Sequence, residues 1–213
     1  MKKTIVLILV SLFIYGCSTS GDPNSNSTPV VPTPTYAVGP NVTDIDGNTY
    51  QSTTICGQTW TKQNLNVSKY TDGTSIPQIT NTSQWSSLTT GAWCYCTNIT
   101  DYGAVYGKIY NWYAVVGIYD AASAANPSLR KKLAPSGWHI PNDAEWTTLT
   151  DCLGGLSVAG GKMKEAGNEH WIAPNTGATN ESGFTGLPAG EYLGLGMFSG
   201  IGQAAYWWSS TMV

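Results

Sequence analysis

The first 40 residues have the composition of a signal peptide and a linker, so a folded domain is expected only after them. Lys2 and Lys3 precede an apolar run from Ile5 to Ile14, and this order is typical of a secretory signal peptide. The run is shorter than the roughly 20 residues that a membrane-spanning helix needs. Of the 23 residues in 18–40, 18 are Ser, Thr, Gly, Asp, Asn or Pro, a composition that cannot bury a core. We expect a signal peptide at 1–16, a linker at 17–40 and one folded domain at 41–213.

The end of the apolar run resembles the lipobox of bacterial lipoproteins. Ile14-Tyr15-Gly16 places a small residue directly before Cys17. The resemblance implies cleavage before Cys17, a diacylglyceryl thioether on its sulfur and acylation of its amino group. Because several acyl chains together give a stable anchor, we expect lipidation of Cys17 and a partnership with the membrane. The location is then the bacterial cell envelope, at the outer membrane in a Gram-negative cell, with the leaflet left open. The alternative is an ordinary secreted protein with a cysteine near its cleavage site.

The charge of the chain excludes some classes of partner. The formal net charge is −3, and removal of Lys2 and Lys3 with the signal peptide lowers it to −5. Contacts to nucleic-acid phosphates need clustered Lys and Arg. The one basic cluster, Arg130-Lys131-Lys132, fits the solvated end of a short helix, so we expect no nucleic-acid partner. Only 11% of residues are charged, against about 25% in an average domain, which fits a turn-rich extracellular domain.

Four cysteines remain besides Cys17, and an exported location permits them to form disulfides. They allow three connectivities, and they are Cys56, Cys94, Cys96 and Cys152. The second and third would point to opposite faces of a strand, so they are not expected to pair with each other. Metal binding by the Cys-x-Cys pair is the weaker alternative, because its spacer is too short for common zinc sites and no histidine is near.

Periodicity and turn signals predict a mixture of strands and helices. A hairpin is expected from Thr49–Ile55 and Thr59–Asn64, followed by strands or core segments at 92–96 and 105–116. Residues 119–133 have a helical pattern that is broken at Pro127. The clearest helix begins after Asn142, which forms a capping box with Glu145, and it ends at Gly154-Gly155. A shorter helix is expected over 157–165, which makes the domain α+β.

The sequence contains no persuasive catalytic set. Asp44 to Asn48 has the acidic spacing of a calcium loop, but Ile55 stands where the loop needs Glu, so a turn is the better interpretation. His139 and His170, the two histidines of the chain, share no metal-binding spacing. No nucleophile elbow is present. We therefore expect no catalytic residue, no metal and no cofactor.

The nine tryptophans are expected mostly in the core, with polar ring nitrogens that need partners. Those that serve a ligand should lie on loops, where their rings could stack on sugars. Trp85 and Trp171 are the candidates for such ligand contacts.

Five segments occur in order along the domain: DIDGNTYQSTTICGQTWTKQNL at 44–65, YGKIYNWYAV at 106–115, APSGWHIPNDAEWTTL at 134–149, NTGATNESGFTGLPAGEY at 175–192 and YWWSST at 206–211. Together they resemble the Fibrobacter succinogenes major paralogous domain family. The third segment is also similar to the GxRLPTEAEW signature of formylglycine-generating-enzyme domains, which share a C-type-lectin-like fold. The resemblance therefore implies that fold, with small twisted antiparallel sheets, two helices and loops rich in glycine and aromatic residues.

The family resemblance implies a function without catalysis. Its members look like surface or adhesion modules and have no established catalytic residues, so we expect a module that binds polysaccharide or another cell-surface component. The alternatives are a carbohydrate-active or formylglycine-generating-type enzyme, a structural envelope component and a non-functional truncated paralogue. Relatives continue past the segment at 206–211, so the C-terminal part of the family domain is expected to be missing.

The resemblance also favours one disulfide. Relatives often carry cysteines at the positions of Cys56 and Cys94. Cys56 ends one predicted strand and Cys94 lies in another, so we expect these two to pair.

Overall fold

The computed structural model describes residues 33–193 and 197–212. The predicted signal peptide, the lipidation site Cys17 and most of the predicted linker lie outside the described residues. Within the described ranges, no helix combines the length and the apolar character that crossing a membrane requires.

The first sheet has three antiparallel strands in the order β1-β2-β3. They are β1 (Tyr36–Thr43), β2 (Thr49–Ile55) and β3 (Gln58–Thr61). The predicted hairpin is confirmed as β2–β3, in which Ile55 pairs with Gln58. Cys56 and Gly57 form the two-residue connection with φ of 49° and 84°, and positive φ at both positions is the geometry of a type I′ hairpin turn.

The turn predicted at Asp44 to Asn48 is also confirmed, because it connects β1 to β2. The Asp44 carboxylate accepts hydrogen bonds from the backbone N–H groups of Asp46 and Asn48, both at 2.9 Å. It also accepts from the Asn48 amide at 2.8 Å and from the Tyr50 hydroxyl. The buried carboxylate therefore stabilises its own loop.

The predicted linker boundary at residue 40 is wrong, because β1 already begins at Tyr36. Val38 is 91% exposed, and the burial of the strand does not alternate. The register of β1 against β2 shifts between Gly39 and Val42, and Pro40 lies in this irregularity. Proline is tolerated in sheets at edge strands and bulges, which explains how a proline-containing segment still pairs.

A second, two-stranded sheet pairs β4 (Trp93–Tyr95) with β5 (Lys108–Tyr110) in antiparallel register. The 3₁₀ segment η1 (Cys96–Asn98) and helix α2 (Tyr102–Tyr106) connect the strands. The prediction of one long strand or core segment over 105–116 is therefore only partly right. Asn111 ends the strand because its Oδ1 accepts from Ala114 N at 3.0 Å and caps helix α3 (Trp112–Val115).

The remaining elements are helices and one short strand pair. Helix α5 (Asp143–Cys152) has the predicted capping box, with Asn142 and Glu145 bonded to each other's backbone N–H groups. Helix α6 (Leu156–Met163) matches the shorter predicted helix. The helical pattern broken at proline becomes α4 (Ala121–Ala125) and the 3₁₀ segment η2 (Pro127–Leu129). Helix α1 (Thr82–Trp85) and the antiparallel pair β6 (Glu191–Leu193) and β7 (Met197–Ser199) complete the set.

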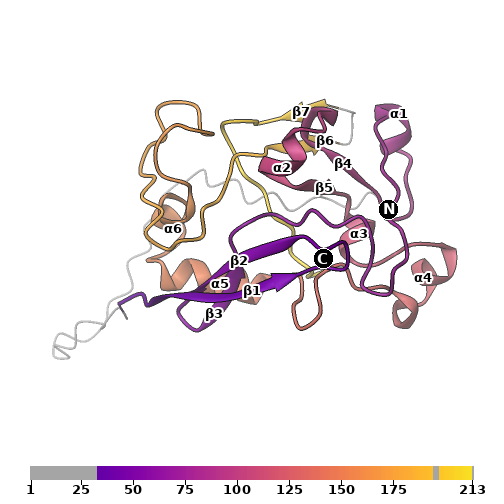
Figure 1. Ribbon diagram of the computed structural model, residues 1–213, viewed down its shortest axis with the longest axis horizontal. Helices are drawn as coiled ribbons and strands as arrows, with labels where there is room; N and C mark the ends of the chain where they lie inside the picture. The colour runs from indigo at the N-terminus through magenta and orange to yellow at the C-terminus, as the bar shows by residue number, and fades with distance from the viewer. Residues whose placement is uncertain (1–32, 194–196, 213) are drawn as a thin grey trace, which may run out of the picture.

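Figure 1 shows how these elements are arranged. Strands β1–β3 lie in the lower part of the view, and the β4–β5 and β6–β7 pairs lie in the upper part. Helices α6 and α4 lie at opposite ends of the long axis. This mixture of helices and small antiparallel sheets confirms the α+β prediction.

Two hydrophobic clusters form the core. The first surrounds the β4–β5 pair and contains Val67, Tyr70, Ile76, Trp93, Tyr110, Ala114, Val115 and Leu133. The second joins the β2–β3 hairpin to α5 and α6 and contains Ile55, Trp60, Leu149, Leu153, Ala159, Met163 and Phe184. Burial of such apolar surface is the main favourable term in folding.

The predicted Cys56–Cys94 disulfide is wrong, because Cys56 pairs with Cys152 at a Cα–Cα distance of 6.5 Å. Cys56 lies in the β2–β3 turn and packs with Cys152 of α5 against the second cluster. Cys94 lies in β4 of the β4–β5 sheet. Cys94 and Cys96 are free and buried, so the expectation that they do not pair with each other is confirmed. Burial raises the pKa of Cys94 to about 12 and that of Cys96 to about 11, which keeps both thiols protonated and unreactive at neutral pH.

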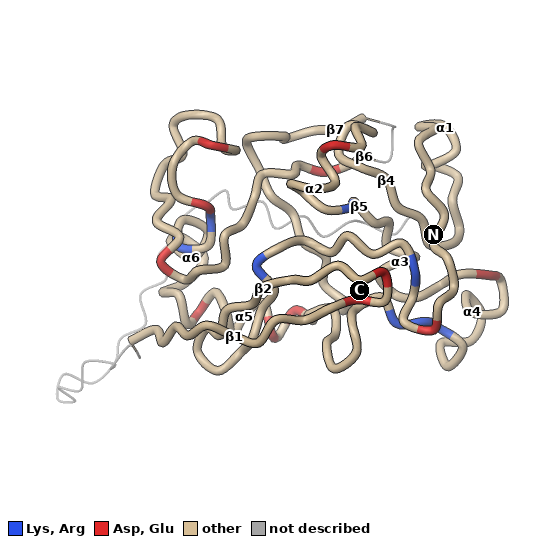
Figure 2. The backbone as a smooth tube through the Cα atoms, viewed as in Figure 1, with Lys and Arg blue, Asp and Glu red and all other residues tan. Residues whose placement is uncertain are grey.

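Charged side chains are sparse over the described residues. Figure 2 shows Lys and Arg positions interspersed with Asp and Glu positions along the backbone. Several are paired, as in Lys69–Asp46 and Lys162–Glu181, both at 2.9 Å. Such exposed pairs contribute little to stability.

Candidate binding pocket beside Trp171

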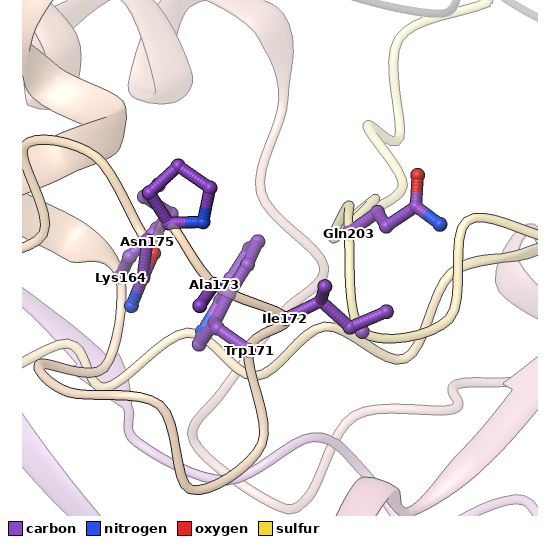
Figure 3. Close-up of a pocket in the computed structure, with 8 residues that line it drawn as sticks. Lys164, Trp171, Ile172, Ala173, Asn175 and Gln203 are labelled. Atoms are coloured by element: carbon purple, nitrogen blue, oxygen red, sulfur yellow. The ribbon is translucent and has the colours of Figure 1, made fainter.

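A small pocket of about 250 Å³ lies where the segment after α6 meets the loop after β7. Ligand pockets commonly measure about 300–1,000 Å³, so this one suits a single small group or the terminal unit of a chain. Figure 3 shows Lys164 and Asn175 together on one side of Trp171, with Ile172 and Gln203 on the other. The lining residues are Lys164, Trp171, Ile172, Ala173, Pro174, Asn175, Gly202 and Gln203.

The pocket forms because the chain leaves α6 as an irregular segment held by long-range hydrogen bonds. The Trp171 Nε1 donates to the Gly186 carbonyl at 3.1 Å. Ile172 N donates to the Gly202 carbonyl at 2.7 Å. Gly202 has a φ of 73°, and a Cβ there would lie 2.9 Å from the Ile172 side chain, so glycine is required for this close approach.

Trp171 forms a wall of the pocket and does not act as an exposed stacking platform. Its side chain is buried, with 6% exposed, and the Lys164 ammonium lies 4.9 Å from its ring centroid. Lys164 also donates to the Thr176 carbonyl at 3.2 Å, and burial lowers the pKa of Lys164. Trp171 therefore lines a pocket, as a ligand-binding residue would. The Lys164 ammonium already covers one face of its ring.

Asn175 carries an unpartnered polar atom behind the wall of the pocket. Its Nδ2 donates to the carbonyls of Glu165 and Gly167, both at 2.8 Å. Both amide hydrogens are therefore used within the loop. Its Oδ1 is buried and accepts no hydrogen bond from the described residues, and an unpartnered buried acceptor is costly. A hydroxyl or N–H group of a ligand could satisfy it after a rotation of the Asn175 side chain that exposes Oδ1 to the pocket.

The structure does not place Trp85, the other predicted ligand residue, at this pocket. Trp85 ends α1, and its ring packs edge-on against Tyr192 of β6 at a centroid distance of 4.9 Å. It is half-buried and is not among the lining residues. The two tryptophans therefore do not form a common site, and the binding role of each stays a prediction.

A group of possible metal ligands lies next to the pocket. One ligand atom each from Glu165, Glu169 and His170 falls within 4.8 Å of the others. His170 Nδ1 already hydrogen-bonds both carboxylate oxygens of Glu165, at 3.0 and 2.9 Å, and Glu169 is exposed. A hydrogen-bonded contact between His170 and Glu165 accounts for this arrangement. The turn that brings Glu165 to His170 has no signal in the sequence spacing.

The histidines show no nucleophilic arrangement in the parts of the chain that the structure covers. His139 is exposed and contacts Glu145 at 2.7 Å, while His170 contacts Glu165. Neither ring hydrogen-bonds a Ser, Thr or Cys side chain among the described residues. The pocket is thus a set of neutral amides, one ammonium and apolar surface, which is chemistry suited to holding a polar ligand.

Comparison with known proteins gives one match. A family model described as the Fibrobacter succinogenes major domain matches residues 53–212. No curated protein and no solved structure matches the chain.

Proposed function

The chain belongs to the Fibrobacter succinogenes major domain family, and from this premise we propose that it is an exported lipoprotein whose single domain binds a polysaccharide or another cell-surface ligand without transforming it. The pocket beside Trp171 is the proposed binding site. The observation that carries the proposal is the buried Asn175 Oδ1 in the pocket wall, which has no partner among the described residues. Because sugars present many hydroxyl donors, a saccharide is a suitable ligand for such an acceptor.

The proposal includes a C-type-lectin-like arrangement of the domain. Support comes from helices α5 and α6, which pack on the β2–β3 hairpin through one shared cluster, and from the small antiparallel sheets. The segment at 134–149, which contains the cap of α5, is similar to the signature of formylglycine-generating-enzyme domains. This similarity also supports the C-type-lectin-like arrangement.

Filling the pocket tests the binding proposal. Ala173 is exposed and lines the pocket, so Ala173→Trp should block the pocket without disturbing the core. We expect this variant to weaken binding to glycans found on an array by about tenfold or more, which corresponds to about 1.4 kcal/mol. The array is probed with the soluble Cys17→Ser form of the full chain.

The matched control is Ala166→Trp, a substitution at an exposed position of the same segment that does not line the pocket. Equal loss of binding in both variants would contradict the assignment of the pocket. Hydrolysis of a bound glycan would favour the enzyme alternative, and the absence of any ligand would favour a structural role.

The lipid anchor is a separate prediction and rests on Cys17, which lies outside the described residues. We expect the wild-type chain, expressed in a Gram-negative host, to partition into the detergent-rich phase of a detergent separation. Cys17→Ser should move it almost completely to the aqueous phase, because the lipids that Cys17 would carry supply the anchor. Ser18→Ala keeps the cysteine and is the control. Equal partitioning of wild type and Cys17→Ser into the aqueous phase would show that no lipid is attached there.

A further inference from the structure

A second and larger cavity, of about 570 Å³, lies apart from the Trp171 pocket. Its walls come from the β1–β2 turn, from the segment after β3 and from the β4–β5 pair. The lining side chains are almost entirely polar, and they are Asp46, Asn48, Asn66, Ser68, Lys69, Tyr95 and Lys108. No residue is shared with the Trp171 pocket.

Lys108 is the unusual member of this lining, because it is a buried lysine with only 9% of its surface exposed. It lies on β5 directly across from Tyr95 of β4. Its Nζ donates to the backbone and side-chain oxygens of Asn66, the latter at 3.0 Å. The ammonium also lies 4.5 Å from the ring centroid of Trp93 and 5.7 Å from that of Tyr95. These contacts fix the position of the charge.

No described carboxylate lies within 4.0 Å of the Lys108 ammonium. The two nearby acids have other partners. Asp46 pairs with Lys69 at 2.9 Å and accepts from Ser68 N at 2.6 Å. Asp44 accepts hydrogen bonds from its own turn and from Tyr50. Burial lowers the pKa of Lys108, and the charges of Asp46 and Asp44 oppose that shift at longer range.

Buried lysines in proteins are almost always paired, because an isolated charge loses its hydration. We propose that the Lys108 cavity is a binding site for an acidic saccharide, one carboxylate of which pairs with the Lys108 ammonium. This inference goes beyond the proposed function, because it adds a second site and names a charged ligand class. It does not depend on the Trp171 pocket.

The rest of the lining favours a uronic acid unit over a phosphate. Asn48, Asn66 and Ser68 supply amide and hydroxyl groups that match sugar hydroxyls, and Tyr95 supplies an aromatic ring. The volume falls within the range of ordinary ligand pockets. Asp46 lines the same cavity, and its charge would repel a dianionic phosphate more strongly than a monoanionic carboxylate.

The test is calorimetric titration of the soluble Cys17→Ser full chain with three probes. They are α-1,4-linked digalacturonate, its carboxyl-reduced neutral counterpart and inorganic phosphate. We expect digalacturonate to bind at least about tenfold more tightly than the other two, because only it offers a charge-assisted hydrogen bond together with hydroxyls. Saturable binding of none of the probes, equal binding of the acidic and neutral sugars, or preference for phosphate would each overturn the proposal.

Substitutions inside and outside the Lys108 cavity test whether digalacturonate binds there. Lys108→Gln should weaken digalacturonate binding by about tenfold or more, while Lys132→Gln, at an exposed lysine outside the cavity, should leave it unchanged. If Lys108→Gln does not fold cooperatively, Ser68→Asp places a competing carboxylate in the lining and should give the same loss, with exposed Ser136→Asp as its control. Unchanged binding in Ser68→Asp or in a folded Lys108→Gln variant contradicts the proposal. Loss confined to Ala173→Trp would move the acidic ligand to the Trp171 pocket, which overturns this inference and leaves the proposed function standing.

Discussion

Removal of the Cys56–Cys152 disulfide is expected to lower the free energy of unfolding by about 2–5 kcal/mol. The bridge joins residues 96 positions apart, so it restricts a long loop of the unfolded chain. It also holds the β2–β3 turn against the end of α5, beside the second hydrophobic cluster. Because a whole domain is stable by only about 5–15 kcal/mol, the loss should be large enough to lower the denaturant midpoint clearly.

Reductant sensitivity distinguishes this bridge from the other connectivities. The Cys152→Ala variant should unfold at the same denaturant concentration with and without reductant, because its disulfide is already absent. Cys94→Ala removes a free thiol and should keep the reductant-dependent shift of the wild type. Loss of that shift in Cys94→Ala, with its retention in Cys152→Ala, would establish a different pairing.

Leu149→Ala is expected to cost a similar amount, about 2–5 kcal/mol, because it leaves a cavity in a closely packed cluster. Leu149 lies in the middle of α5 and has 0% of its surface exposed. Its cluster connects the β2–β3 hairpin with α5, α6 and Phe184. The lost contacts therefore affect several elements of the fold at once.

Leu156→Ala is the matched control, since Leu156 is the first residue of α6 and is 55% exposed. Exposed substitutions commonly change stability by less than about 0.5 kcal/mol. Urea unfolding followed by tryptophan fluorescence measures both variants. Similar midpoints for Leu149→Ala and Leu156→Ala would mean that the second cluster does not form as described.

The sequence predicts the start of α5 and the β2–β3 turn, because contacts between residues close in the chain determine the geometry of both. Asn142 and Glu145 specify the start of α5 through hydrogen bonds within four residues. Gly57 permits the tight turn between β2 and β3. Strand β1 has no such local signal in the sequence. It lies at the edge of its sheet, contains Pro40 and is largely exposed, so it has no alternating pattern. Its pairing with β2 decides its conformation.

Tertiary contacts decide the rest. The partner of Cys56 depends on how the hairpin packs on α5, and no local pattern near Cys94 excludes the wrong choice. The Trp171 pocket depends on the meeting of segments about 30 residues apart, which brings Ile172 to Gly202. Lys108 does have a local signal, because it is the single charge within the aromatic segment at 106–115.

The position of the disulfide has a mechanical consequence for a domain anchored through its N-terminus, as proposed. Tension from the anchor would reach the folded part at β1, an edge strand. Directly before this strand, the Thr35 carbonyl accepts a hydrogen bond from Cys56 N at 2.9 Å, and Cys56 is covalently joined to α5. Pulling force would therefore pass within a few residues from the edge strand to a covalent link and on to the helix. A ligand held against fluid flow would therefore load the disulfide-linked connection at β1 as well as the cavity that holds the ligand.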